Sequence, residues 1–291
     1  MKTIHTDAVK EQVRKTLLEM NCTLSADVEE NISWAIKEEK SPVGIEVLQT
    51  IEKNLQIAGE KNLPICQDTG MVVAFVKIGQ QLKLDGPFIG RQIEEGVRQA
   101  YEEGYFRKSV VSDPLLRKNT KDNTPAVIHY EMVEGDQVEI ILTAKGFGSE
   151  NMSGLKMLKP ADGVEGVIEF VLETVEKAGP NACPPLFIGI GIGGTMEKAA
   201  ILAKKALVRE ERENGQDYYR KLESELLEKL NKLGIGPMGL GGTQSVLQVG
   251  IETYPTHIAG LPVAVNVCCH VNRHAAFTIE SGVEGEVDQD A

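Results

Sequence analysis

The spacing of apolar residues divides the chain into an N-terminal part with helical periodicity and a longer part with strand-like runs. Leu17 and Leu18 belong to a first helical segment, and a second one begins after Ser25, a residue type that caps helices well. A third begins at Ser41-Pro42 and ends at Gly59, and its apolar residues repeat at the helical period. The pattern predicts that residues 1–62 are helical.

The remaining residues alternate apolar strand-like runs with amphipathic segments. We predict strands over 71–78, 126–130, 138–143, 186–188, 244–252 and 261–267, and helices over 88–104, 162–178, 195–208 and 216–232. The turn-forming run 134–136 predicts that 126–130 and 138–143 form a β-hairpin. We therefore expect an α+β fold over 1–280, in which the helical part precedes mixed α/β structure with a largely antiparallel sheet. Residues 281–291 are expected to be an acidic tail.

Charge and hydropathy narrow the functional classes. The 291 residues carry a net charge of −12, which argues against nucleic acid or an anionic membrane surface as a partner. No apolar run approaches the ~20 residues of a membrane-spanning helix, and the first residues lack the apolar core of a signal peptide. We expect a cytoplasmic protein.

Four of the five cysteines, at three places along the chain, stand where strands begin or end. Cys66 and Cys183 each precede an apolar strand, and the pair Cys268-Cys269 follows one. Thiols at strand ends can be gathered into one pocket, and three ligands leave a metal site open for a substrate. Cys22 lies within an amphipathic helical run and is expected to be a core residue.

Polar residues near these cysteines suggest acid–base chemistry on an anionic substrate. Asp68 follows Cys66 closely and suits proton transfer, although an aspartate in a loop also stabilises turns. His257 lies in a turn between two strands, where it could act on a substrate or serve the fold alone. Arg107 and the basic residues after it supply cations for a dicarboxylate.

The run Gly189–Gly194 contains the glycine spacing of a dinucleotide-binding loop, G-x-G-x-x-G, between an apolar strand and a helix. A nucleotide-binding unit of that kind needs a second parallel strand after the helix, with an acidic residue at its end. Here the helix over 195–208 is followed by an acidic run and a further helix. We therefore expect a tight turn, whose backbone N–H groups could also face a carboxylate or cluster sulfides.

Zinc is another alternative, because His270 and His274 stand four residues apart beside Cys268 and Cys269. Adjacent cysteines seldom bind one tetrahedral ion together, and the sequence has no C-x-x-C spacing. We therefore disfavour a zinc site.

Five motifs, in this order, resemble those of the α subunit of class I fumarate hydratases and L-tartrate dehydratases. They are 64–70 (PICQDTG), 122–126 (DNTPA), 145–151 (KGFGSEN), 183–185 (CPP) with 193–195 (GGT), and 269–273 (CHVNR). The resemblance covers roughly residues 10–280. It implies an oxygen-sensitive hydro-lyase with a [4Fe–4S] cluster that is held by loops at strand ends.

The resemblance also implies roles for individual residues. Three cysteines of the family hold the cluster and leave one iron for substrate, and by position these are Cys66, Cys183 and Cys269. Cys269 is preferred to Cys268 because the family's cysteine stands four residues before an arginine, which is Arg273 here. The catalytic positions match Asp68 and His257, and the substrate-binding positions match Gln67, Arg107, Gly146 and Gly148.

The expected reaction is the reversible hydration of fumarate to (S)-malate, with the open iron acting as a Lewis acid. Dehydration of L(+)-tartrate to oxaloacetate is the alternative, and a non-catalytic iron–sulfur subunit or a nicotinamide-dependent enzyme are further ones. Single-chain members of the family continue into a domain that carries the base, a threonine, whereas this sequence ends at Ala291. We therefore expect a β subunit as partner, in an α2β2 assembly, and a small dicarboxylate as substrate.

Overall fold

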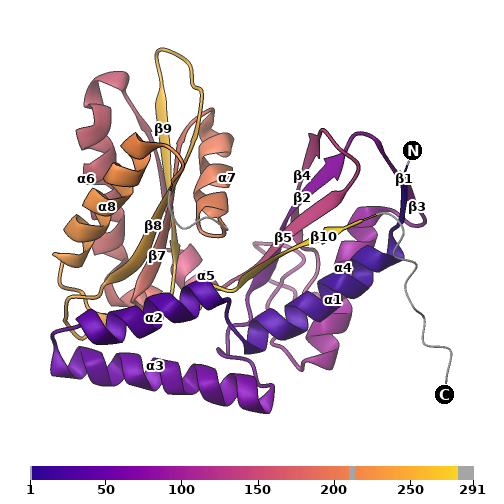
Figure 1. Ribbon diagram of the computed structural model, residues 1–291, viewed down its shortest axis with the longest axis horizontal. Coiled ribbons are helices and arrows are strands. Elements are labelled where there is room, and N and C mark those ends of the chain that lie inside the picture. The colour runs from indigo at the N-terminus through magenta and orange to yellow at the C-terminus, as the bar shows by residue number, and fades with distance from the viewer. Residues whose placement is uncertain (1, 210–213, 281–291) are drawn as a thin grey trace. The chain divides into compact units, whose positions relative to one another are not determined.

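The computed structural model describes residues 2–209 and 214–280, and the chain divides into two compact units. Unit 1 comprises Met1–Thr23, Lys61–Lys145 and Arg273–Ala291, and unit 2 comprises Leu24–Glu60 and Gly146–Asn272. Each unit has a four-stranded mixed sheet and its own helices (Figure 1). Helices and strands are interspersed after the helical N-terminal part, and most strand pairs in the two sheets are antiparallel, which confirms the predicted fold class. The acidic tail predicted over 281–291 lies outside the described residues.

Unit 1 is built from two long helices and two sheets. Its elements are β1 (Lys2–His5), α1 (Asp7–Cys22), β2 (Met71–Gly79), β3 (Leu82–Asp85), α4 (Ile89–Glu103), β4 (Val127–Val133), β5 (Val138–Lys145) and β10 (His274–Ile279). The larger sheet has the order β10-β5-β2-β4, and β1 pairs with β3 in a separate two-stranded sheet. β1 contradicts the prediction that residues 1–62 are helical, and β3 and β10 were not among the sequence predictions.

The predicted hairpin of 126–130 and 138–143 is wrong, because β2 lies between β4 and β5. β2 pairs parallel with β4, with Val73 opposite Val127, and antiparallel with β5, with Ala74 opposite Leu142. The physical reason is burial: β2 and β5 are apolar along most of their length, whereas β4 exposes Tyr130 and Met132 and so suits a sheet edge.

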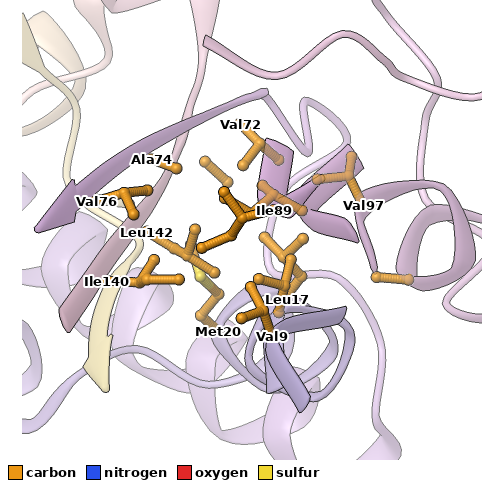
Figure 2. Packing of buried hydrophobic residues seen from close by; sticks show 14 of the residues in the cluster. Val9, Leu17, Met20, Val72, Ala74, Val76, Ile89, Val97, Ile140 and Leu142 are labelled. Atoms are coloured by element: carbon orange, nitrogen blue, oxygen red, sulfur yellow. The ribbon is translucent and has the colours of Figure 1, made fainter. Parts of the chain in front are cut away.

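The core of unit 1 lies between one face of the larger sheet and helices α1 and α4. Side chains alternate between the two faces of a strand, so Val72, Ala74 and Val76 of β2 share a face with Ile140 and Leu142 of β5. Figure 2 shows these residues gathered against labelled side chains of the two helices. Each fully buried Val, Leu or Ile contributes about 1.5–3 kcal/mol, so this layer fixes the position of the β2 N-terminus.

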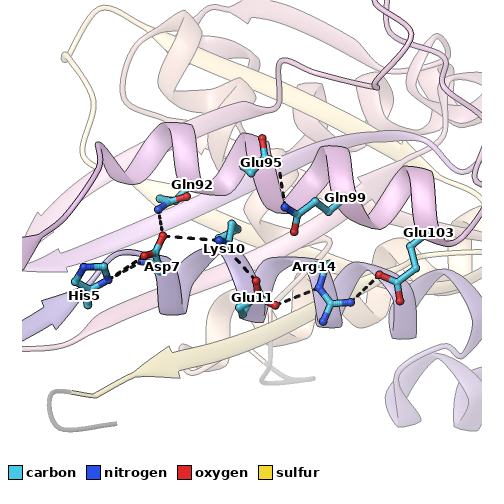
Figure 3. A network of polar contacts seen from close by, with 9 residues as sticks. All are labelled: His5, Asp7, Lys10, Glu11, Arg14, Gln92, Glu95, Gln99 and Glu103. Atoms are coloured by element: carbon cyan, nitrogen blue, oxygen red, sulfur yellow. Dashed lines mark hydrogen bonds and ion pairs between the residues drawn. The ribbon is translucent and has the colours of Figure 1, made fainter. Parts of the chain in front are cut away.

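A polar network joins α1 to α4 along the outer side of this core (Figure 3). Asp7 binds Gln92 of α4, and Arg14 bridges Glu11 of its own helix, at 3.2 Å, to Glu103 of α4, at 2.7 Å. Exposed ion pairs of this kind contribute little to stability, about 0–1 kcal/mol each. The network therefore adds little to stability, and the apolar core holds the two helices together.

Unit 2 begins with two helices, α2 (Ala26–Glu38) and α3 (Pro42–Lys61). Its sheet has the order β6-β9-β7-β8 and consists of β6 (Gly154–Leu158), β7 (Leu186–Gly193), β8 (Val246–Tyr254) and β9 (Leu261–Cys268). The other helices are α5 (Phe147–Glu150), α6 (Gly163–Ala178), α7 (Met196–Ala206) and α8 (Asp217–Asn231), with the short 3-10 turns η1 (Pro160–Asp162), η2 (Gly179–Ala182) and η3 (Pro237–Gly239). Figure 1 shows the sheet between α7 on one side and α6 and α8 on the other.

The glycines of the G-x-G run lie within a strand and not in a turn. Gly189 and Gly191 point from β7 toward α7, where an added Cβ would overlap with the carbonyl oxygens of Ala203 and Ala199. They therefore allow close packing of helix on strand, and the expected turn is confined to Gly193-Gly194 at positive φ. A parallel strand, β8, does follow α7 and α8, contrary to the expectation, but the glycines have a packing role that accounts for them.

Within the described residues, no helix is both long and apolar enough to cross a membrane.

Candidate active site

The loop that carries Cys66 leads directly into the buried strand β2. Cys66 is half-buried, and the backbone N–H of Asp68 donates to its Sγ at 3.4 Å. The Asp68 side chain in turn accepts the N–H of Gly70 through Oδ1 at 3.1 Å, which closes a tight turn. Backbone N–H donors aimed at sulfur are common around metal-bound cysteines, so this turn suits a cysteine ligand.

Gly70 ends this loop at a position where no other residue fits without strain. Its φ is +79°, and an added Cβ would lie 2.8 Å from the carbonyl carbon of Ala144 and 2.9 Å from that of Lys145. Only glycine adopts this conformation at such a close approach. The start of β2 is therefore pressed against the end of β5, and Cys66 is placed by that contact.

Tyr101, on α4, supports the loop that carries Cys66. Its hydroxyl donates to the carbonyl oxygens of Thr69 at 2.6 Å and Gly70 at 3.1 Å, and its ring is fully buried. Burial raises the pKa of the Tyr101 hydroxyl well above its ordinary value, although the Arg273 charge opposes this shift. The hydroxyl therefore stays protonated and donates to both carbonyls.

Asn123 ties the same loop to the segment that carries Arg107. Its Nδ2 donates to the Gly70 carbonyl at 3.1 Å, and its Oδ1 accepts the N–H groups of Ser109 at 2.8 Å and Val110 at 3.2 Å. Asn123 has a positive φ of 62°, which asparagine tolerates better than most residues. The segment is thereby fixed beside the cysteine loop.

Gln67 and Arg107, both expected to bind substrate, contact each other directly. The Arg107 Nη1 donates to Gln67 Oε1 at 3.1 Å, and the Thr69 hydroxyl donates to the Arg107 carbonyl at 3.0 Å. Gln67 and Arg107 are exposed, whereas Thr69 is buried. The structure therefore places an amide and a guanidinium beside Cys66 and Asp68, where they can bind an anionic ligand from solvent.

Arg273 is the largest fully buried side chain of the described residues. Its Nε donates to the Ala144 carbonyl and its Nη1 to Asn21 Oδ1, both at 3.2 Å. The Asn21 carbonyl accepts the N–H of Ile65 at 2.9 Å, so Arg273 is linked to the residue before Cys66. A buried cation is costly unless its donors are satisfied, so Arg273 marks a constrained position.

The supporting residues Tyr101, Asn123 and Arg273 were given no structural role from the sequence. Asn123 and Arg273 stand in the quoted motifs, which is a signal that sequence reasoning had available. Tyr101 lies on the apolar side of a predicted helix, where a tyrosine is not distinguished from any other core residue.

Cys183 and Cys269 lie at the same end of the sheet of unit 2. Cys183 is exposed, in the left-handed conformation, between η2 and the cis Pro184-Pro185 bond that precedes β7. β7 and β9 are antiparallel, with Phe187 opposite Cys268, so Cys269 emerges beside the start of β7. The structure thus places two of the three predicted cysteine ligands at one end of the sheet, although they are far apart along the chain.

His270 links the two cysteine loops. Its Nδ1 lies 3.0 Å from the Cys183 carbonyl oxygen, and because a carbonyl only accepts, Nδ1 carries the proton. Burial lowers the pKa of the His270 imidazole below its ordinary value, and the hydrogen bond to Cys183 opposes that shift. His270 therefore acts as a neutral donor that fixes the Cys183 backbone.

Burial separates the two neighbouring cysteines. Cys268 is 3% exposed at the end of β9, and Cys269 is half-buried in the loop that follows. The more accessible Cys269 is the better ligand candidate of the two. Cys22 is buried in the core of unit 1, which confirms the prediction for it, and burial raises the pKa of its thiol.

The glycine-rich motif forms α5 and the residue before it. Gly146 precedes the helix, and a Cβ at Gly148 would meet only the Asn181 carbonyl, at 3.9 Å, in the turn before Cys183. Glu150 holds the helix in place, since its carboxylate accepts from Lys204 at 2.5 Å and from Asn266 at 3.0 Å. Gly148 is therefore positioned beside the Cys183 loop with open space around its Cα.

His257 lies at the other end of the sheet from these cysteines. It is exposed in the turn between β8 and β9, where its Nδ1 accepts the Ala259 N–H at 3.2 Å. β9 runs from this turn to Cys268, so the length of the strand separates His257 from Cys183 and Cys269. Within one chain, the structure does not bring His257 together with the cysteine pair.

The cysteine donors suit an iron–sulfur cluster by their chemistry. In residues 2–209 and 214–280, no three His, Cys, Asp or Glu side chains are grouped closely enough to hold a metal ion, and Cys66 belongs to unit 1 while Cys183 and Cys269 belong to unit 2. All three are thiols in loops at strand ends, outside the hydrophobic cores, and Cys66 receives an N–H donor. Loop thiolates with such donors are the usual ligands of iron–sulfur clusters.

Comparison with known proteins identifies the family. The sequence model of the family described as fumarate hydratase (Fumerase) matches residues 10–278. The chain is 46% identical over 264 residues to "Putative L(+)-tartrate dehydratase subunit alpha" of Methanocaldococcus jannaschii, covering 88% of this chain and 92% of the relative. It is 33% identical over 268 residues to L(+)-tartrate dehydratase subunit alpha of Escherichia coli O157:H7, covering 89% of this chain and 87% of the relative. The chain therefore belongs to the fumarate hydratase (Fumerase) family.

Proposed function

We propose that this chain is a subunit of a hydro-lyase that removes water from a four-carbon 2-hydroxy dicarboxylate. The observation that carries the proposal is the contact of Arg107 with Gln67. Gln67 stands between Cys66 and Asp68 on one loop, and Arg107 reaches it from another segment. It puts an anion-binding pair next to a metal-type thiol and a carboxylate. Membership of the family supports the reaction class.

Cys66, Cys183 and Cys269 would hold a [4Fe–4S] cluster in this proposal. When bound, such a cluster supplies an iron with an open coordination position, a Lewis acid that makes hydroxide a better leaving group. The Asp68 N–H donates to Cys66, and the His270 ring donates to the Cys183 carbonyl, so hydrogen bonds hold the ligand loops in place.

The residues of the chain would bind and orient the substrate. Arg107 would bind one carboxylate of the substrate, and Gln67, already its partner, would orient the guanidinium and hydrogen-bond the ligand. Asp68 would accept or relay a proton at its carboxylate, which the Gly70 N–H orients through Oδ1. Gly146 and Gly148 would contact the substrate through their backbone, since neither has a side chain to obstruct it.

A role for His257 would require a second copy of the chain. The turn that carries it and the cysteine end of the sheet are separated by the length of β9. Within unit 2 this imidazole does not reach the cysteine end of the sheet, so we propose that it acts in the site of a neighbouring copy.

L(+)-tartrate is the first candidate substrate. Sequence reasoning favoured fumarate and malate, but the relatives from Methanocaldococcus jannaschii and Escherichia coli carry the name of a tartrate dehydratase. Fumarate, or malate in the reverse direction, is the second candidate because the matching family is described by that reaction.

A second subunit is part of the proposal. Both relatives are named as subunit alpha, and the chain covers most of their length. We propose an α2β2 assembly in which the partner completes the active site and the chain alone is inactive.

The test is an anaerobic assay of the chain alone and with a co-expressed second subunit of a tartrate dehydratase. We expect no turnover alone, and in the complex a higher kcat/KM for L(+)-tartrate than for (S)-malate. A higher value for malate would favour the second candidate. Absence of turnover of either acid by an iron-loaded complex would contradict the proposal.

A further inference from the structure

Glu39, in the short connection between α2 and α3, is a buried carboxylate that the proposed chemistry does not use. Its side chain is 4% exposed. Oε1 accepts the backbone N–H groups of Lys40 and Ser41, both at 2.8 Å, and of Thr243 at 2.9 Å. Oε2 accepts the N–H of Gln244 at 2.9 Å. One side chain thus satisfies four backbone donors from two distant segments.

These donors keep the carboxylate ionised. Burial alone would raise the pKa of the Glu39 carboxyl, but hydrogen bonds from the backbone of Ser41, Thr243, Gln244 and Lys40 outweigh it and lower the pKa. The Thr243 hydroxyl also donates to Oε1, at 3.2 Å. Removing the buried anion would leave these donors unsatisfied, so the carboxylate is held firmly in place.

The segment that Glu39 holds is the glycine-rich loop 234–243. A Cβ at Gly242 would lie 2.7 Å from Glu39 Oε2, so only glycine lets the carboxylate approach. The loop folds back on itself, since Gly241 donates to the Ile235 carbonyl at 2.9 Å and Gly236 to Ser245 Oγ at 3.0 Å. With several glycines at positive φ, the loop has little conformational preference of its own and relies on such anchors.

The same loop contacts the residues on both sides of Cys183. The Met238 N–H donates to the Pro184 carbonyl at 2.7 Å, and Gly239 packs so closely on Pro180 that a Cβ would overlap with it. The Cys183 N–H donates back to the Pro180 carbonyl at 3.2 Å. The glycine-rich loop therefore supports the left-handed turn that presents the Cys183 thiol.

We infer that Glu39 is a positioning residue for Cys183, which it fixes through the glycine-rich loop 234–243. The inference rests on the proposed role of Cys183 as a cluster ligand, and it assigns to the α2–α3 connection a function in shaping the site. Loss of the carboxylate frees the loop first, and the Cys183 turn then loses the support of Met238 and Gly239.

The test is amide hydrogen exchange of the full-length, metal-free chain, with Glu39→Gln compared with Glu38→Gln. Glu38 is the exposed neighbour, and only its backbone carbonyl faces Thr243. In Glu39→Gln we expect exchange at the Met238 and Cys183 amides to be about fivefold faster or more, the effect of losing one net hydrogen bond. Amides of β7, β8 and β2 should keep their wild-type rates.

Iron loading provides a second readout. After anaerobic reconstitution, Glu39→Gln should bind several-fold less iron than Glu38→Gln, with a weaker visible absorption band from sulfur-to-iron charge transfer. The glutamine variant keeps the size of the side chain, so a change confined to these readouts reports the placement of Cys183.

Two other outcomes of the exchange measurement overturn the inference. Unchanged exchange at Met238 and Cys183 would show that the loop does not depend on Glu39. Faster exchange throughout the sheet of unit 2, or recovery of the variant only as unfolded protein, would make the carboxylate a general requirement of the fold. A wild-type chain that binds no iron would instead contradict the proposed cluster and leave the exchange result standing.

Discussion

The guanidinium of Arg107 donates to the side-chain oxygen of Gln67 at 3.1 Å, although the two residues are separated by a helix and two strands along the chain. Both groups are exposed, and the backbone on either side is fixed by the Thr69 hydroxyl and by Asn123. The pair therefore presents an amide and a guanidinium to solvent on the loop of Cys66 and beside it, and we propose that it binds an anionic substrate.

Arg107→Lys is predicted to weaken substrate binding more than it slows the chemical step. Lysine keeps the charge but loses the planar fork that a carboxylate binds with two bonds. We expect KM for the dicarboxylate to rise by about tenfold, the equivalent of one charge-assisted hydrogen bond. Steady-state kinetics of the anaerobic complex measure this effect. The control is Arg117→Lys, in an exposed turn of the same segment, and an equal rise in KM there would contradict the role of Arg107.

Arg273→Met is predicted to destabilise unit 1. The substitution leaves Asn21 Oδ1 and the Ala144 carbonyl without their buried donors. Each unsatisfied group costs about 1–3 kcal/mol, so the free energy of unfolding should fall by about 2–5 kcal/mol. Urea titration followed by circular dichroism checks the value. The exposed Arg91→Met on α4 should change it by less than about 0.5 kcal/mol, and similar losses in both variants would refute the special role of Arg273.

Tyr101→Phe isolates the contribution of the hydroxyl that supports the cysteine loop. The ring keeps its edge-to-face contact with Phe106, while the carbonyls of Thr69 and Gly70 lose their shared donor. We expect a loss of about 1–2 kcal/mol in unfolding free energy and faster amide exchange near Cys66. Tyr105→Phe, at a 94% exposed position, is the matched control. Equal stability of the two variants would show that the hydroxyl does not hold the loop.

Acid stability should depend on Asp122. Burial would raise the pKa of its carboxyl, but the Thr124 N–H and hydroxyl and the Arg98 guanidinium outweigh this and hold it below the ordinary value of 3.8. Because the folded-state pKa is lowered, Asp122 contributes stability above pH 3.8, and this contribution is lost as the pH falls through the folded pKa.

The measurement for Asp122 is unfolding free energy as a function of pH. The wild-type curve should fall below about pH 4, and Asp122→Asn should remove part of that slope while lowering stability at neutral pH. Asp85→Asn, which removes an exposed carboxylate in the same unit, serves as control. An unchanged slope in Asp122→Asn would contradict the assignment.

The sequence predicted the bounds of helices and strands better than it predicted which strands pair with each other. Long periodic segments such as α4 and α6 begin and end within one or two residues of the predicted bounds. The pairing of β4 with β5 was wrong because nearness along the chain does not reveal that β2, from fifty residues earlier, inserts between them. The apolar run of β2 and the polar residues of β4 carried the needed signal, since they distinguish central from edge strands.

The sequence predicted which residues belong to the candidate site, but not how all of them are arranged in space. The spacing of Cys183 and Cys269 relative to β7 and β9 does place them together, because both stand at ends of strands that prove to be antiparallel neighbours. The same topology places His257 at the opposite end of β9, which a turn position alone does not reveal. The supporting contacts of Glu39 and Arg273 depend on tertiary packing, so the local sequence pattern does not predict them.

The central claim is that Cys66, Cys183 and Cys269 hold the cluster of a hydro-lyase. The most direct measurement is iron and acid-labile sulfide per chain after anaerobic reconstitution of single-cysteine variants. We expect about four iron atoms in the wild type, and the same in Cys22→Ala and Cys268→Ala with wild-type circular dichroism. Serine at position 66, 183 or 269 should abolish the intact cluster. Full iron and sulfide in any of those three variants, or a wild-type chain that binds neither, would contradict the account.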